Sequence, residues 1–257
     1  MSKQTAAEYF KENHYVVIEN FISKETASFL YDYVKMAADR LAFAEYQVPN
    51  FDKEFFGSFD DEQAPGDYSK YGDLVFDTLL AHKLPDMEYF TGKKLIPTYS
   101  YHRLYTTDTE LKRHKDRPSC EISTTLCIGY DNSNVDASKY PDWDWPMFVG
   151  PKTGEIGTEG MPIHMKPGDM LIYRGDVVEH WREPLWGNNH AQVFLHYNEK
   201  EGQYDIPYDG RPLLGMPSTF RSKEALNKNE DIAVSKQDND SESKGLFMPE
   251  YKDKVVY

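Results

Sequence analysis

The 257-residue sequence predicts an α+β fold that is mainly β, in which helices come first and a β-sandwich or barrel follows. Two observations predict this order. Up to about residue 92, apolar residues recur at helical spacing. From about 93 to 200 they lie in short β-branched and aromatic runs separated by Gly, Pro, Asp and Asn. We therefore expect one domain over residues 1–220, followed by a polar and loosely ordered tail over 221–257.

The N-terminal part begins with a helix start signal. Thr5 and Glu8 have the spacing of a capping box, in which the side chain of each residue binds the backbone amide of the other residue. A strand is expected over 14–21, and Ser23 is expected to cap a longer helix. The apolar stripe of that helix consists of Phe29, Leu30, Tyr33, Val34, Ala37 and Leu41.

The next two segments differ in pattern. Residues 45–70 are acidic, aromatic and interrupted by Pro and Gly, which predicts a long surface loop of the kind that is often functional. Residues 72–91 have helical spacing, and Gly92 is placed where a helix C-cap is expected.

The β part is predicted from six short runs, at 95–105, 120–130, 145–150, 161–165, 169–175 and 190–197. Cys120 and Cys127 lie seven residues apart on one of these expected strands. An odd separation places them on opposite faces, so they cannot pair with each other there. We expect both to be reduced, as in a cytosolic protein.

The charge balance argues against several classes of partner. Asp and Glu number 43 and Lys and Arg 29, a formal net charge of −14. An acidic chain repels phosphate backbones, so no nucleic-acid partner is expected. We found no run of apolar residues long enough to cross a membrane and no signal-type N-terminus, so we expect a cytoplasmic protein without membrane association. The oligomeric state stays open.

Three residues form a candidate metal-binding set. His114 and Asp116 are separated by one residue, and on an extended backbone such residues point to the same side. His180 follows another strand-like run, which begins after the turn at 167–169. Two imidazoles and one carboxylate make the facial triad that suits Fe(II), whereas zinc sites more often contain thiolates. We predict that His114, Asp116 and His180 are metal ligands and catalytic residues.

The context of these residues resembles that of the Fe(II)- and 2-oxoglutarate-dependent oxygenases, in particular their prolyl-hydroxylase-like branch. Residues 14–34 resemble the opening strand and helix of the family. Tyr105 lies nine residues before His114, where a cosubstrate-binding Tyr is common, and residues 166–173 match the turn and strand before the distal histidine. Pro184 and Gly187 follow His180 as in the family. The resemblance covers roughly residues 14–198.

The resemblance implies a double-stranded β-helix (jelly-roll) core, with Fe(II) as metal, 2-oxoglutarate as cosubstrate and O₂ as oxidant. It implies hydroxylation of an unactivated C–H bond with release of succinate and CO₂. Related halogenases carry a small residue in place of the metal-binding Asp. Because Asp116 is present, we expect hydroxylation or desaturation rather than halogenation.

One departure from the family pattern concerns 2-oxoglutarate. The family usually anchors its far carboxylate with an Arg or Lys nine or ten residues after the distal histidine, where this chain has Asn189 and His190. A buried carboxylate still needs a cation. We expect Arg103 to supply it, because it lies two residues before Tyr105 on the same strand. The other cosubstrate contacts expected are Tyr105, His190 and Gln192, and the remaining candidate cations are Lys152, Arg117, Arg174 and Arg182.

The prime substrate is expected to be a peptide or a small molecule. Residues 45–70 and 132–150 are expected to line its binding site, although an acidic surface loop is an equally good interpretation. Two other functions remain open from the sequence. One is a non-catalytic cupin-like protein that binds a metal or senses a ligand, and the other is a jelly-roll carbohydrate-binding module.

Overall fold

The computed structural model describes residues 4–47, 53–140 and 143–230. Its N-terminal part is mainly helical, as the sequence predicts. The elements are α1 (Ala6–Asn13), β1 (Tyr15–Ile18), α2 (Lys24–Gln47), α3 (Lys53–Phe56), β2 (Tyr68–Tyr71), α4 (Leu74–His82) and α5 (Leu84–Thr91).

The following part is mainly β. Its strands are β3 (Leu95–Thr106), β4 (Leu111–His114), β5 (Ile122–Asp131), β6 (Met147–Val149), β7 (Met161–Ile163), β8 (Met170–Arg174), β9 (His180–Arg182) and β10 (Asn189–Glu199). Three short 3₁₀ turns complete the assignment, namely η1 (Pro118–Cys120), η2 (Pro207–Gly210) and η3 (Ser218–Phe220).

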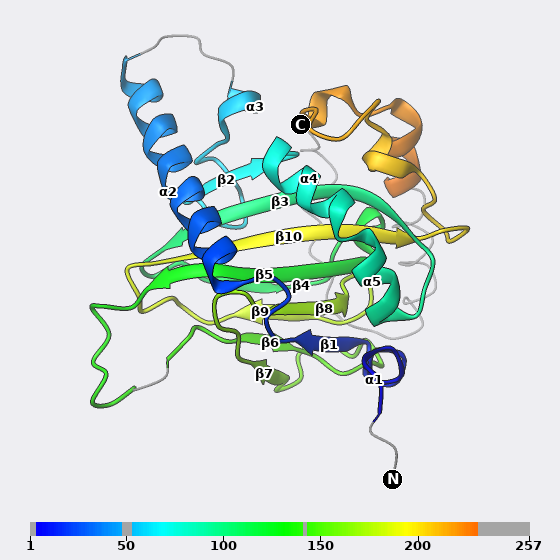
Figure 1. Cartoon of the computed structure of the whole chain (residues 1–257), viewed down its shortest axis with the longest axis horizontal. Helices are drawn as coiled ribbons and strands as arrows, with labels where there is room; N and C mark the ends of the chain where they lie inside the picture. Colours follow the sequence, from blue (N-terminus) through cyan, green and yellow to red (C-terminus); the bar gives the residue numbers. More distant parts are fainter. Residues whose placement is uncertain (1–3, 48–52, 141–142, 231–257) are drawn as a thin grey trace.

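These strands form two antiparallel sheets. One has six strands in the order β1-β8-β5-β10-β3-β2, and the other has four in the order β4-β9-β6-β7. Helices α2, α4 and α5 lie across the outer face of the larger sheet (Figure 1). This mixture of helices and antiparallel sheets is consistent with the predicted jelly-roll core. Among the described residues, no helix is both long enough and apolar enough to cross a membrane.

The helix signals in the sequence are confirmed. The Thr5 and Glu8 side chains form the capping box at the start of α1. Ser23 Oγ accepts a hydrogen bond of 3.1 Å from the amide of Thr26, which caps α2. Gly92 ends α5 with a φ of 68°, a left-handed conformation that costs glycine little.

Two segment predictions need correction. Residues 45–70 are not one long loop, because α2 runs to Gln47 and the segment also contains α3 and β2. β2 pairs with β3 as an edge strand, which the acidic and aromatic composition of the segment concealed. The helical stretch 72–91 divides into α4 and α5 at Lys83. Pro85 lies in the first turn of α5, where its missing N–H leaves no hydrogen bond unmade.

The two faces of the large sheet have different chemistry. On β10, Ala191, Val193 and Leu195 pack with the helices, while His190 and Gln192 alternate with them and face the other way. On β5, Leu126 and Ile128 join the helix-side core, whereas Cys127 joins the core between the sheets. Cys120 and Cys127 are both buried and free, as expected. The face toward the smaller sheet is therefore the polar and aromatic interior of the barrel.

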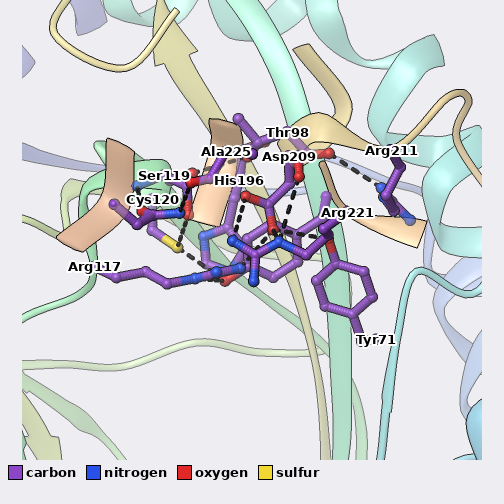
Figure 2. Close-up of polar contacts among 12 residues, drawn as sticks. Tyr71, Thr98, Arg117, Ser119, Cys120, His196, Asp209, Arg211, Arg221 and Ala225 are labelled. Carbon is purple, nitrogen blue, oxygen red and sulfur yellow. Dashed lines mark hydrogen bonds and ion pairs between the residues drawn. The ribbon is translucent and has the colours of Figure 1, made fainter. Parts of the chain in front are cut away.

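Residues after β10 return to the barrel and dock through a buried carboxylate. Asp209, which is fully buried, accepts hydrogen bonds from Tyr71, Tyr204 and Arg117 at 2.7–2.8 Å, and it also pairs with Arg221 (Figure 2). We call these five residues the Asp209 cluster. The first part of the predicted loose tail is helical over 223–230. Residues 231–257 lie outside the described part of the chain.

Candidate metal centre

The three predicted ligands meet where β4 ends and β9 begins. His114, the last residue of β4, is paired across the smaller sheet with His180, the first residue of β9. Asp116 follows two residues after His114. One ligand atom from each of the three lies within 4.8 Å of the others. The strand pairing thus brings together residues that are 66 positions apart in the sequence.

Backbone carbonyls fix the orientation of both imidazoles. His114 Nδ1 lies 2.7 Å from the carbonyl of Lys112, and His180 Nδ1 lies 3.1 Å from that of Val178. When Nδ1–H donates to a carbonyl, Nε2 keeps its lone pair for a metal. The Nε2 atoms of His114 and His180 lie 3.7 and 3.5 Å from Asp116 Oδ1. The donor atoms therefore converge in the way that a facial triad requires.

The second oxygen of Asp116 is held by its own partner. Ser123 Oγ on β5 donates a 2.6 Å hydrogen bond to Asp116 Oδ2, and the Asp116 amide donates to the carbonyl of Gly175 at 2.8 Å. Gly175 leaves the room that this arrangement needs. A Cβ at that position would lie 2.1 Å from Asp116 Oδ2 and 2.5 Å from Ser123 Oγ. Neither Ser123 nor Gly175 was singled out from the sequence, where nothing marks a contact between these strands.

The pKa values of Asp116 and His114 favour the protonation states that bind a metal cation. Burial alone would raise the pKa of Asp116, but His180 and His114 outweigh it and hold that pKa well below its usual range. Burial and the neighbouring His180 lower the pKa of His114 to about 4. At neutral pH Asp116 is therefore ionised and His114 is neutral, which are the states that bind a metal.

The residues predicted to contact 2-oxoglutarate lie side by side on β3 and β10. Tyr105 is paired with His190, and Arg103 is paired with Gln192. All four side chains are buried. Gln192 Nε2 lies 3.0 Å from His190 Nδ1, and the Gln192 carbonyl oxygen accepts a 2.7 Å bond from Thr125. The sequence thus identified a group of neighbours in the barrel interior.

The guanidinium of Arg103, however, already has partners. Its Nε donates a 2.7 Å hydrogen bond to Asp61, its Nη2 donates a 2.8 Å bond to Gln63, and its Nη1 donates to the Tyr105 hydroxyl at 3.3 Å. Asp61 and Arg103 form a salt bridge in which both side chains are 9% exposed. The positive charge of Arg103 is therefore neutralised within the chain.

Three of the four other candidate cations are also paired or exposed. Arg117 binds Asp209, Arg174 binds Glu121 and Asp176, and Lys152 is exposed. The fourth, Arg182, is 2% exposed and lies on β9 two residues after the metal-ligand candidate His180. Within the described residues no carboxylate lies within ion-pair distance of it.

Residues 45–70 and 132–150, which were expected to line the substrate site, both reach the interior of the barrel. Asp61 and Gln63 contact Arg103, and Ala64 packs in one cluster with Tyr105 and Trp145. The Trp145 ring also lies against that of His190, at 5.3 Å between ring centroids. Residues 141–142 lie outside the described part of the second segment.

Several solved structures have a similar fold, although no protein-family model and no curated protein sequence matches the chain. HygX from Streptomyces hygroscopicus, solved with nickel, 2-oxoglutarate and hygromycin B bound, is 12% identical with a TM-score of 0.54. The match covers 78% of this chain and 88% of HygX. EctD from S. alaskensis, solved with 2-oxoglutarate and 5-hydroxyectoine, is 13% identical with a TM-score of 0.51, over 77% of this chain and 78% of EctD.

A Pseudomonas putida prolyl-4-hydroxylase is 12% identical with a TM-score of 0.48, over 76% of this chain and 97% of its own. The chain has the fold of the 2-oxoglutarate- and Fe(II)-dependent oxygenases, as the sequence resemblance predicted.

Proposed function

We propose that this chain is a 2-oxoglutarate-dependent Fe(II) dioxygenase. It hydroxylates an unactivated C–H bond of a peptide or small molecule, and it converts 2-oxoglutarate and O₂ into succinate and CO₂. The observation that carries this proposal is the convergence of His114 Nε2, His180 Nε2 and Asp116 Oδ1 at one point of a barrel. Structures of the same fold that were solved with 2-oxoglutarate bound support it.

The three candidate ligands fit Fe(II) both in residue type and in the orientation of their donor atoms. Two imidazoles and one carboxylate on one side of a metal leave its other positions open for ligands. Fe(II), when bound, supplies the one-electron chemistry with O₂ that amino-acid side chains lack. The carbonyls of Lys112 and Val178 hold the two rings, and Ser123 holds the carboxylate. The chain itself keeps the donor atoms aligned, so binding a metal requires little rearrangement.

Titration and turnover test the proposal together. Purified without oxygen, the wild-type protein should bind one Fe(II), and adding 2-oxoglutarate should produce a visible charge-transfer band. On admission of air it should form succinate slowly even without a prime substrate. His114→Ala should lose the band and succinate formation, whereas His82→Ala, at an exposed residue of α4, should keep both.

The other candidate functions correspond to different outcomes. A cupin-like protein without catalysis would bind the metal through the same residues but form no succinate. A carbohydrate-binding module would bind neither Fe(II) nor 2-oxoglutarate at this site. An undiminished band in His114→Ala would contradict the assignment of the ligands.

A further inference from the structure

A second group of buried polar atoms lies close to the metal centre and is incompletely paired. Arg182 Nη2 and His190 Nε2 are both shielded from solvent, and neither has a hydrogen-bond partner among the described residues. Leaving such a group unpaired inside a protein costs roughly 1–3 kcal/mol, and more when it is charged. Two unpaired nitrogens near each other therefore indicate that a ligand completes the site.

The two residues belong to one cluster. Arg182 influences the pKa of His190, so the two side chains are near each other. Both also contact the same ring, because the Arg182 guanidinium lies 4.6 Å from the centroid of Trp145 and the His190 ring lies 5.3 Å from it. Gln192 contacts His190, and Tyr105 contacts Trp145 at 4.9 Å. We call these five residues the Arg182 cluster.

Trp145 holds Arg182 in place at some cost in backbone strain. Its φ is 51°, a left-handed conformation that is rare for a bulky residue and costs about 1–3 kcal/mol. Its carbonyl accepts a hydrogen bond from Arg182 Nη1, and its own Nε1 donates to the carbonyl of Glu183. The Trp145 backbone and ring thus fix one side of the guanidinium, while Nη2 stays available.

The position of the cluster relative to the metal centre suits a ligand that spans both. Residues 180 and 182 lie on one face of β9 because they are two apart on a strand. Tyr173 lies close to both ends, since its ring lies 4.7 Å from that of His180 and it is near enough to Arg182 to influence the pKa of that side chain. A molecule that reaches from the triad past Tyr173 would meet Arg182.

The charges specify the chemistry of that molecule. Arg103 is neutralised by Asp61, and Asp144, whose Oδ1 lies 2.8 Å from His164 Nδ1, forms no ion pair with Arg182 within the described part of the chain. A divalent metal on Asp116 leaves one net positive charge at the triad, and Arg182 adds a second one. A dicarboxylate carries the two negative charges that balance these. The low pKa of His190, which burial and Arg182 cause, keeps its imidazole neutral, so it can donate one hydrogen bond without adding charge.

We propose that Arg182 and His190 bind the far carboxylate of 2-oxoglutarate, in place of the Arg103 that the sequence favoured. This inference rests on the proposed function, because it assumes that 2-oxoglutarate is the cosubstrate. The Arg182 guanidinium on β9, in the smaller sheet, supplies the charge that the position ten residues after His180 lacks, and His190 at that position on β10 supplies a neutral donor. The two together make the charge-assisted contact that a buried carboxylate needs.

The test compares two ligands that differ only in the far carboxylate. Calorimetric titrations use protein loaded with Zn(II) in place of Fe(II), and the ligands are 2-oxoglutarate and 2-oxopentanoate, which carries a methyl group where 2-oxoglutarate has that carboxylate. The wild type should prefer 2-oxoglutarate by about 30-fold or more, the effect of a buried charge-assisted pair. Arg182→Met should lose this preference and bind both acids with similar affinity.

Matched variants separate the two arginines and check folding. Arg103→Met should keep the preference, because Arg103 is tied to Asp61 and Gln63. Arg182→Lys should restore part of it, since a lysine supplies charge but not two parallel hydrogen bonds. His190→Phe should reduce it by a smaller factor than Arg182→Met. Circular dichroism and thermal unfolding establish that each variant is folded.

The possible failures point to different errors. If the wild type binds neither acid, the proposed function is wrong. If the wild type prefers 2-oxoglutarate and Arg182→Met keeps that preference, the site assignment is wrong even though the cosubstrate is right. Loss of the preference in Arg103→Met alone would return the anchor to Arg103.

Discussion

The Asp209 cluster and the Arg182 cluster both bury arginine inside the same barrel, but they differ in how completely their polar atoms are paired. In the Asp209 cluster, two arginines and two tyrosines converge on one carboxylate, and Figure 2 shows these contacts. In the Arg182 cluster, the guanidinium contacts an aromatic ring and one carbonyl, and no carboxylate of the described residues pairs with it. Complete pairing is typical of a cluster that holds the fold together, whereas incomplete pairing indicates a binding site.

The electrostatics of the two clusters agree with this distinction. Burial alone would raise the pKa of Asp209, but Arg117 and Arg221 outweigh it and lower that pKa. The pKa of Arg117 is raised well above its usual value, since the pairing with Asp209 outweighs burial. Burial lowers the pKa of Arg182, because the surrounding groups compensate the loss of water only in part. The charge of Arg182 is thus the one left for a ligand to balance.

The largest predicted effect is on folding stability and concerns the Asp209 cluster. Asp209→Asn removes the fully buried carboxylate that pairs with both Arg117 and Arg221, so the free energy of unfolding should fall by about 3–5 kcal/mol. Urea unfolding followed by circular dichroism measures it. Asp205→Asn is the control, because Asp205 forms a half-exposed pair with Lys228 and such pairs contribute about 1 kcal/mol or less. Equal losses in the two variants would mean that the Asp209 cluster is not a structural one.

The second prediction concerns stabilisation by the ligand. With Zn(II) bound and 2-oxoglutarate at about 100 times its dissociation constant, the wild type should gain about 2.7 kcal/mol of stability. At the same concentration Arg182→Met should gain much less. Without ligand, this variant should be as stable as the wild type or more stable, because it removes an unpaired buried charge. A large loss of stability in ligand-free Arg182→Met would contradict the contrast between the clusters.

The candidate metal ligands could be grouped from the sequence because the relevant geometry is local. Two residues on a strand share a face, so His114 and Asp116 could be grouped, and the strand before His180 is marked by its turn. The choice between Arg103 and Arg182 was not predictable in this way. That choice depends on the contact between Arg103 and Asp61, which lies 42 residues earlier in a segment expected to be a loop. It also depends on the hydrogen bonds of Trp145 with Arg182 and Glu183. Contacts of this kind follow from tertiary packing and leave no periodic signal.

The helical and strand elements show the same limit. The capping box at Thr5 and the C-cap at Gly92 depend on neighbouring residues and were predicted correctly. The edge strand β2 was missed because its stability comes from pairing with residues of β3 that lie 30 to 36 positions later in the sequence.

The third prediction concerns the support of the metal centre, which is as fully paired as the Asp209 cluster. Gly175→Ala would place a methyl group against the Asp116 carboxylate and displace it, so metal affinity should fall by about 10- to 100-fold. Ser123→Ala removes one hydrogen bond without adding bulk, so its loss should be at the lower end of that range. Competition with a coloured chelator measures both. A larger loss in Ser123→Ala than in Gly175→Ala would show that the hydrogen bond matters more than the space.

The smallest predicted effect tests whether one unpaired group is enough to mark a binding site. Both ring nitrogens of His102 are buried and have no hydrogen-bond partner in the described part of the chain, and the ring packs against Tyr68 and Phe76 on the helix side of the sheet. Burial lowers the pKa of His102 from the ordinary value of 6.5 to about 4. Between these pH values the unfolded chain binds a proton that the folded chain does not. The contribution of His102 to stability is therefore complete above pH 6.5 and is lost as the pH falls toward 4.

His102→Phe removes this titration and keeps an aromatic ring in the same space. The free energy of unfolding should therefore decline less steeply between pH 6.5 and 4, by up to about 1.4 kcal/mol per pH unit. Part of the remaining decline comes from the other histidines with lowered pKa values, His14, His114, His190 and His196. Urea unfolding at several pH values measures the slope, and calorimetry should give unchanged binding of 2-oxoglutarate. Because the His102 ring packs against Tyr68 and Phe76 on the helix side of the sheet, unchanged binding would show that an unpaired nitrogen alone does not mark a ligand site. Weaker binding in His102→Phe would contradict the placement of the ligand beside Arg182.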